Sequence, residues 1–172
     1  CGADGMRLYT EVAALGLDGV RVWRTSHTGG HRFAPTALTF PDGRAWAWLD
    51  ADLVRGIVER SLPAATAAAH DRGSVAIGDP FAQAAESAVF GVEGWGWLDR
   101  PRTVTVDATD PDRRLVTVTA DPVPDAQPAR RTYRVEVVQK GTIPVPDCGH
   151  PIDEARKSSP DLVVTGVERV GG

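Results

Sequence analysis

The pattern of apolar residues changes at Pro101, and this change constrains the fold more than any other feature of the chain. Before Pro101, helical and strand-like segments alternate. After it, apolar and polar residues alternate in several short segments, which is typical of strands with one buried face. We therefore expect an α/β (α+β) protein that ends in a small β-rich module at residues 101–172. The strands expected in this module are 103–107, 115–119, 133–139 and 162–170.

Residues 1–61 carry the signals of a first unit. The spacing of Leu8 and Val12 predicts a short helix that ends at Gly16, and the alternation in 20–25 predicts a strand. The sequence Pro41-Asp42-Gly43-Arg44 predicts a hairpin turn, because proline fixes φ and glycine accepts a positive φ. The other expected elements are strands at 36–40 and 45–49, with Trp46 and Trp48 on one face, and a helix to about Ser61 capped by Asp50 or Asp52.

Residues 62–100 are expected to connect this first unit to the β-rich module. We expect 63–78 to be irregular. A helix then begins at Asp79-Pro80, because aspartate caps helix N-termini and proline fits the first helical position. The stretch 91–97 ends this helix, so the chain divides into residues 1–61, 62–100 and 101–172.

Composition excludes several classes of protein. The 19 basic residues against 23 acidic ones give a net charge of −4, which attracts neither nucleic acid nor an anionic membrane surface. No apolar run approaches the roughly 18 residues that a membrane span needs. The two cysteines, Cys1 and Cys148, are too few for a disulfide framework. We therefore expect no nucleic-acid partner and no membrane, while the oligomeric state stays open.

His27 and His31 stand four residues apart, in a loop rich in glycine and arginine. On a helix this spacing would place both imidazoles on one face, but Gly29 and Gly30 between them disfavour a helix. Glycines let a tight loop fold closely around a bound group, so that both imidazoles could converge on it. Taken alone, the spacing is more often that of loop histidines with ordinary hydrogen bonds.

The longer pattern HTGGHRFAPT at residues 27–36, followed by a strand and Pro-Asp-Gly, resembles the sucrase/ferredoxin-like family. The similarity continues through 46–50, Arg72-Gly73, the helix from Asp79 and residues 143–149, so it covers most of the chain. The resemblance implies a thioredoxin-like ferredoxin domain at 1–61. It does not imply sugar hydrolysis.

The resemblance also implies a [2Fe–2S] cluster held by two cysteines and two histidines. The histidine pair of the family maps onto His27 and His31, with Gly29 and Gly30 between them, and its second cysteine maps onto Cys1. The first cysteine and the first strand of the family would lie upstream of residue 1. We therefore expect that the functional protein is longer, or that this is a degenerate or truncated member without a complete cluster. Cys148 falls outside the cluster loop and is expected to be a free thiol.

From these features we expect a cytoplasmic electron carrier, rather than an enzyme, that moves single electrons between a reductase and an acceptor. Imidazole ligands make such a cluster less negative than an all-cysteine one, so its reduction potential should be higher. An exposed second ring nitrogen would make the potential depend on pH. Arg24 and Arg32 would favour the reduced state if they lie close, and are otherwise solvated surface arginines.

Two alternatives remain. In the first, His27, His31 and Cys1 bind zinc, or nothing, in a structural module. In the second, the protein is a hydrolase acting on sugars, although no acid/base pair stands out. We expect structural roles for the five tryptophans and for the acidic residues that cap helices. The tryptophans are Trp23, Trp46, Trp48, Trp95 and Trp97, and the carboxylates weighed for hydrolysis are Asp50, Asp52, Asp79 and Glu86.

Overall fold

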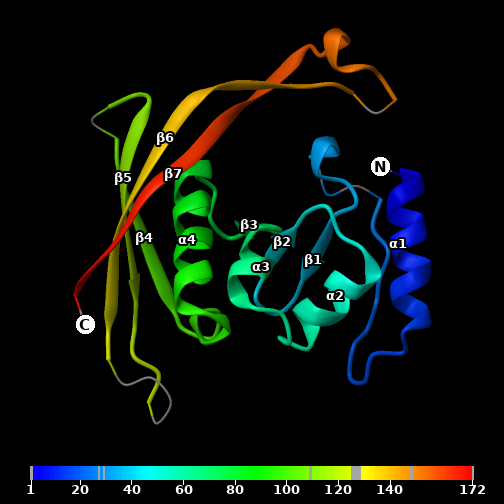
Figure 1. Ribbon diagram of the computed structural model, residues 1–172, viewed down its shortest axis with the longest axis horizontal. Coiled ribbons are helices and arrows are strands. Elements are labelled where there is room, and N and C mark those ends of the chain that lie inside the picture. Colours follow the sequence, from blue (N-terminus) through cyan, green and yellow to red (C-terminus); the bar gives the residue numbers. More distant parts are fainter. Residues whose placement is uncertain are drawn as a thin grey trace.

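The structure, a computed structural model, describes residues 2–26, 28, 30–108, 110–124, 129–147 and 149–171, with the backbone alone for His31. It is a mixed α+β fold with two antiparallel sheets, which confirms the expected fold class (Figure 1). One sheet has the order β1-β2-β3 and the other has the order β4-β5-β6-β7. The elements are α1 (Gly2–Ala14), η1 (His31–Phe33), β1 (Ala37–Thr39), β2 (Arg44–Trp46), α2 (Ala51–Val58), α3 (Ala64–Ala68), β3 (Asp71–Ser74), α4 (Pro80–Glu93), η2 (Trp95–Trp97), β4 (Arg102–Asp107), β5 (Arg113–Ala120), β6 (Arg131–Val145), η3 (Ile152–Glu154) and β7 (Lys157–Gly171).

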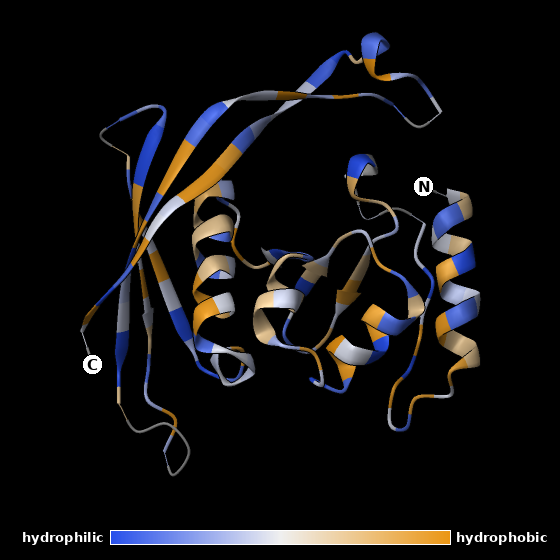
Figure 2. Cartoon of the chain, viewed as in Figure 1, coloured by the Kyte–Doolittle hydropathy of each residue, from blue (hydrophilic) through white to orange (hydrophobic). Residues whose placement is uncertain are grey.

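The first helix confirms the expected helical pattern. Leu8 and Val12 are buried on one face of α1, and Gly16 follows the helix with a φ of +59°. Apolar and polar residues alternate along α1, as Figure 2 shows. No described helix combines the length and the apolar character that are needed to cross a membrane.

The predicted strand at 20–25 is wrong. This segment contains no strand, and the Trp23 side chain is 80% exposed. A strand needs a neighbour that pairs with its backbone N–H and C=O groups. Within the described residues no strand pairs with this segment. Alternation of residue types therefore did not suffice to form a strand here.

The predicted hairpin is confirmed in shorter form. Strands β1 and β2 pair antiparallel, with Ala37 opposite Trp46, and Gly43 in the turn has a φ of +63°. Strand β2 ends at Trp46, which is buried. Trp48 lies beyond the strand end with a φ of +53° and is 51% exposed, so the prediction that both tryptophans share one strand face is wrong.

Residues 63–78 are not irregular, contrary to expectation. They contain α3 and β3, and β3 pairs antiparallel with β2. Both elements are too short to leave a clear period in the sequence. Close packing on α4 explains Gly73, where an added Cβ would come within 2.9 Å of the Gln83 Cβ.

Helix α4 begins as predicted. The Asp79 side chain accepts a hydrogen bond from the Ala82 N–H at 2.9 Å, and Pro80 opens the helix. The helix lies between the two sheets (Figure 1) and is largely apolar in Figure 2. Its buried residues pack in one core with the inward-facing valines of β5 and β6, which are Val116, Val118, Val135 and Val137.

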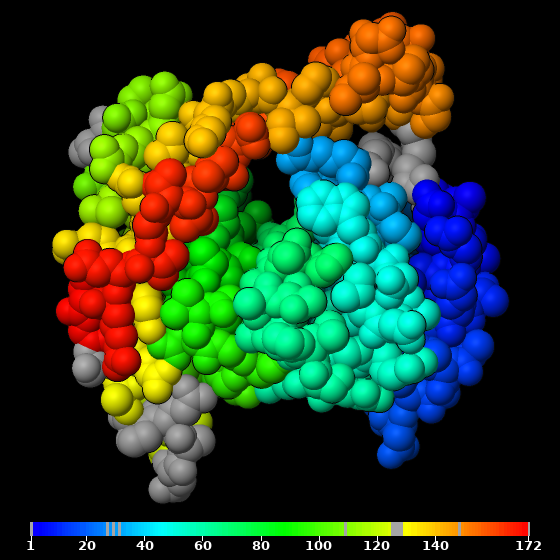
Figure 3. Space-filling view, viewed as in Figure 1, coloured from blue at the N-terminus to red at the C-terminus, as the bar shows by residue number. Residues whose placement is uncertain are grey.

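All four predicted strands of the C-terminal module are confirmed, but β6 and β7 are longer than expected. They pair with each other from Thr132 and Gly171 to Val145 and Lys157. Beyond the end of β5 they continue as a two-stranded arm that arches towards the N-terminal half (Figure 1). The space-filling view in Figure 3 shows an opening beneath this arm.

A buried group of charges joins the two sheets. Arg44 of β2 forms ion pairs with Asp71 of β3 and, at 2.7 Å, with Glu86 of α4, and all three side chains are 0% exposed. The other Glu86 oxygen accepts a hydrogen bond from Trp97 Nε1 at 3.1 Å and forms an ion pair with Arg102 Nε at 3.0 Å. Burial would lower the pKa of Arg44, but the charges of Asp71 and Glu86 outweigh burial and raise it. Arg44 therefore stays charged.

Replacing Arg44 with methionine should strongly destabilise the protein. The change would leave the buried carboxylate of Asp71 without a cation and Glu86 Oε2 without its ion-pair partner, which costs about 3–5 kcal/mol. The free energy of unfolding in urea measures this loss. The control Arg60→Met removes an ion pair with Asp99 at 2.7 Å in which both side chains are exposed. The free energy of unfolding should therefore fall by less than about 1 kcal/mol. Equal small losses in both variants would contradict the structural role of the buried group.

Candidate functional site

The predicted ligands and their glycines lie largely outside the described residues. This holds for Cys1, His27, Gly29 and the side chain of His31, and also for Cys148. The structure describes the residues that hold the histidine loop in place. The described part of the loop consists of Thr28, Gly30 and the residues that follow.

The described part of the loop forms a tight turn rather than a continuous helix. The hydroxyl groups of Thr28 and Thr36 are 2.8 Å apart and close the loop at its base. Inside it, the Phe33 N–H donates to the Gly30 carbonyl at 2.9 Å, which forms the single turn η1. The expectation that the glycines prevent a helix between the two histidines agrees with this geometry at Gly30, whose φ is +70°.

Trp48 fixes the η1 turn to the end of β2. Its backbone N–H donates to the Phe33 carbonyl at 2.8 Å, and its indole Nε1 donates to the Arg32 carbonyl at 3.0 Å. A φ of +53° is costly for a tryptophan, so the surrounding contacts must maintain it. The position of η1, and with it the backbone of His31, therefore depends on the sheet.

Two arginines stack on one aromatic ring beside His31. The Arg72 guanidinium carbon lies 4.0 Å from the centre of the Phe33 ring, and that of Arg32 lies 4.4 Å from it. The Trp48 ring packs against Phe33 at 5.3 Å between ring centres. Partial burial, followed by the charge of Arg32, lowers the pKa of Arg72. We call these four side chains the Phe33 cluster: Arg32, Phe33, Trp48 and Arg72.

Gly30 allows the Phe33 cluster to approach the loop backbone. A Cβ added there would lie 2.8 Å from an Arg72 nitrogen and 2.9 Å from a carbon of the Phe33 ring. The tip of the Arg72 side chain could move aside. The Phe33 ring could not move as easily, because Trp48 packs against it and two guanidinium groups stack on it.

Arg24, the other arginine near the histidines in sequence, contacts α1. Its guanidinium nitrogen lies 2.9 Å from the Met6 sulfur, and its guanidinium carbon lies 5.9 Å from the centre of the Tyr9 ring. The described contacts of Arg24 thus differ from those of Arg32, which stacks on Phe33. Sequence reasoning treated the two arginines alike.

No group of three or more histidine, cysteine, aspartate or glutamate side chains lies close enough to hold a metal ion among the described residues. The predicted ligands Cys1, His27 and the His31 side chain lie outside the described residues. The two remaining histidines have other contacts. His70 Nδ1 lies 3.0 Å from the Ala47 carbonyl, and His150 pairs with Glu154 at 2.9 Å.

The carboxylates considered for hydrolysis all have structural contacts. Asp50 accepts from the Leu53 N–H at 2.8 Å as the cap of α2, and Asp79 caps α4. Asp52 pairs with Arg55 at 3.3 Å, and Glu86 belongs to the buried group of charges. These contacts account for the four carboxylates without an acid/base role.

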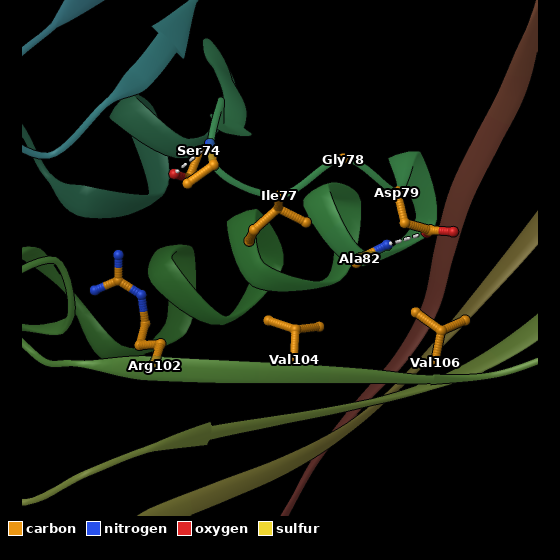
Figure 4. Close-up of a pocket in the computed structure, with 9 residues that line it drawn as sticks. Ser74, Ile77, Gly78, Asp79, Ala82, Arg102, Val104 and Val106 are labelled. Atoms are coloured by element: carbon orange, nitrogen blue, oxygen red, sulfur yellow. Dashed lines mark hydrogen bonds between the residues drawn. The ribbon is translucent and has the colours of Figure 1, made fainter.

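A pocket lies between α4, the turn that precedes it and β4. It is formed by residues that lie well after the histidine loop in the sequence. Its volume is about 500 Å³, and Ile77, Val104 and Val106 line it together with Arg102 (Figure 4). Asp79 caps α4 at its rim, and Arg102 is paired with Glu86. The polar groups of this pocket are thus engaged in the fold, so it offers no reacting group.

Sequence reasoning missed Arg72 and Trp48 as neighbours of the histidine loop. Arg72 comes from β3, and Trp48 follows β2, so the pairing of these two strands brings both residues to Phe33. The only signals in the sequence were the family-like range 46–50 and the Arg72-Gly73 pair. Their meaning depended on β3, which the sequence did not reveal.

Comparison with known proteins supports the resemblance in the first part of the chain. A sequence model described as sucrase/ferredoxin-like matches residues 1–73, from α1 to Gly73 of β3. No curated protein and no solved structure matches the chain. The matched range includes the histidine loop and all four residues of the Phe33 cluster.

Replacing Gly30 with alanine should destabilise the loop. Both the positive φ and the contact with Phe33 oppose a Cβ there, so we expect a loss of about 1–3 kcal/mol in urea unfolding. Gly78→Ala is the matched control, because an added Cβ there meets nothing within 4 Å. A Gly30 variant as stable as the control would show that the loop does not need this close approach.

Proposed function

We propose that this chain carries single electrons on a [2Fe–2S] cluster, because its residues 1–73 match the sucrase/ferredoxin-like family model. His27 and His31 would bind one iron. Cys1 and a cysteine from an upstream segment would bind the other. When bound, the cluster would accept and release one electron.

The observation that carries the proposal is the tight η1 turn of the histidine loop, which lies beside the cationic Phe33 cluster. The Thr28–Thr36 contact and the η1 turn fix the described backbone of this loop at Thr28 and at His31–Phe33. Two imidazoles and two thiolates are a donor set that suits this type of cluster. The donor set that the family resemblance implies is therefore chemically suited to the cluster.

The charge near the loop favours an added electron. A cluster with two thiolate and two neutral imidazole ligands becomes more negative by one charge when it is reduced. Arg32 and Arg72 carry positive charge beside the backbone of His31 and form no ion pair with any described residue. They would stabilise the reduced form and raise the reduction potential.

The partners would be a reductase and an acceptor protein, and we propose the cytoplasm as the compartment. Its reducing conditions keep cysteine thiols available as ligands. A zinc or structural module is the outcome to be distinguished, because the same histidines and cysteine could hold zinc.

The first test measures iron, acid-labile sulfide and zinc, with an EPR spectrum after reduction. It uses this chain and a version extended upstream, both made anaerobically with iron supplied. We expect about two iron and two sulfide per protein in the extended version, as a [2Fe–2S] cluster requires, and an EPR signal that His31→Ala abolishes. His150→Ala is the matched control and should keep the signal, because His150 pairs with Glu154 on the arm of β6 and β7 and is not a proposed ligand. Colourless protein, or stoichiometric zinc, in both versions would refute the proposal.

The reduction potential should fall as pH rises. The added electron raises the proton affinity of the free imidazole nitrogens, so reduction takes up a proton over the range in which they titrate. The slope should approach about 59 mV per pH unit for one proton and one electron. His31→Cys, which removes one titrating ligand, should flatten this dependence. A potential independent of pH in the wild type would exclude histidine ligation with an exposed ring nitrogen.

A further inference from the structure

We infer that the Phe33 cluster is the docking surface for an acidic patch on the protein that exchanges electrons with this chain. The surface is Arg32 and Arg72 stacked on Phe33, flanked by Trp48. Its role in electron transfer rests on the proposed function, but the docking itself depends only on the described residues.

Uncompensated positive charge is the first observation behind this inference. Neither Arg32 nor Arg72 forms an ion pair with any described residue, whereas Arg44, Arg60 and Arg102 do. Residues 19–41 contain three arginines and no acidic residue, although the whole chain has a net charge of −4. The positive charge is thus local, and local charge steers an oppositely charged partner to one face.

No described residue on the arm of β6 and β7 forms an ion pair with Arg32 or Arg72. The arm arches above η1 in Figure 1 and carries acidic residues near its tip. Two of these have partners on the arm itself, because Asp147 pairs with Lys157 at 3.6 Å and Glu154 pairs with His150 at 2.9 Å. Within the described residues, the two guanidinium groups therefore have no carboxylate partner.

The chemistry of the cluster indicates a protein rather than another anion. Arginine and tryptophan are enriched at the energetic centres of protein interfaces, and Trp48 is 51% exposed here. Guanidinium groups that stack on an aromatic ring keep their N–H edges free for carboxylates.

The position of the cluster suits electron transfer. Trp48 donates to the Arg32 carbonyl, and Arg32 is adjacent to His31 in the η1 turn. A partner bound to the Phe33 cluster would therefore sit against the turn that carries a proposed ligand. Tight burial of a large area is not required, because redox encounters are typically small and transient.

Binding of a fluorescein-labelled peptide of ten glutamates, followed by fluorescence anisotropy, tests the inference. The full chain is used at about 20 mM salt, where charge attraction is weakly screened. We expect binding that Arg32→Gln/Arg72→Gln weakens about fivefold or more. Arg32→Lys/Arg72→Lys, which keeps the charge, should retain most of the affinity. The urea midpoints of all variants are compared with that of the wild type, and single substitutions replace any double variant that does not fold.

The matched control is Arg130→Gln/Arg134→Gln, which removes the same charge from the C-terminal module. Arg130 pairs with Asp121 at 2.8 Å, and Arg134 lies exposed on β6. The control should bind the peptide as the wild type does. Equal weakening in the control would overturn the inference, because it would show an effect of net charge alone.

Two further outcomes would also overturn it. One is wild-type affinity in the folded Arg32/Arg72 glutamine variant. The other is displacement of the peptide by inorganic phosphate beyond that caused by sodium chloride at the same ionic strength, which would identify a small-anion site. Iron content and EPR are recorded on the same samples. Because the complete cluster needs the upstream cysteine, the version extended upstream is measured in parallel. Peptide binding by that version without a cluster would refute electron transfer but leave the acidic docking intact.

Discussion

The ion pairs of Arg44 hold the architecture together. Arg44 lies on the central strand of the small sheet, and its partners come from the neighbouring strand and from α4. Through Glu86, the same group reaches Arg102 on the first strand of the large sheet. Isolated buried charges would be very costly, so each member requires the others to be in place. The two sheets and the helix between them are thus fixed relative to one another by charge as well as by apolar packing.

The histidine loop depends on that arrangement. Pairing of β2 with β3 positions Trp48 and Arg72, and these two side chains hold Phe33 and the η1 turn. The loop is therefore not an independent binding segment. A change in the pairing of β2 with β3 would move Trp48 and Arg72, and these side chains contact the η1 turn that contains the backbone of His31. This arrangement explains why a loop rich in glycine can still hold a defined turn.

Much of the fold could be predicted from local signals, while contacts between distant segments could not. A few adjacent residues predict the helix start at Asp79-Pro80 and the turn at Pro41–Arg44, and both are confirmed. The segment 20–25 alternates apolar and polar residues as a strand does, but no strand pairs with it among the described residues. Strand β3 pairs with β2, although its four residues show almost no such alternation. At the site, the sequence predicted the histidine loop and its glycines. It could not predict the Phe33 cluster, because that cluster requires two strands to pair correctly.

The long arm formed by β6 and β7 has a consequence for solubility. Beyond the end of β5 it is a two-stranded ribbon, so its outer edges expose backbone groups that could pair with another copy of the chain. The arm contains features that hinder such pairing. Pro144 and Pro160 lack an N–H, Lys140 and Asp161 carry charges, and the register shifts between Gln139 and Gly141. The ribbon can therefore extend well past the core of the protein without becoming a template for aggregation.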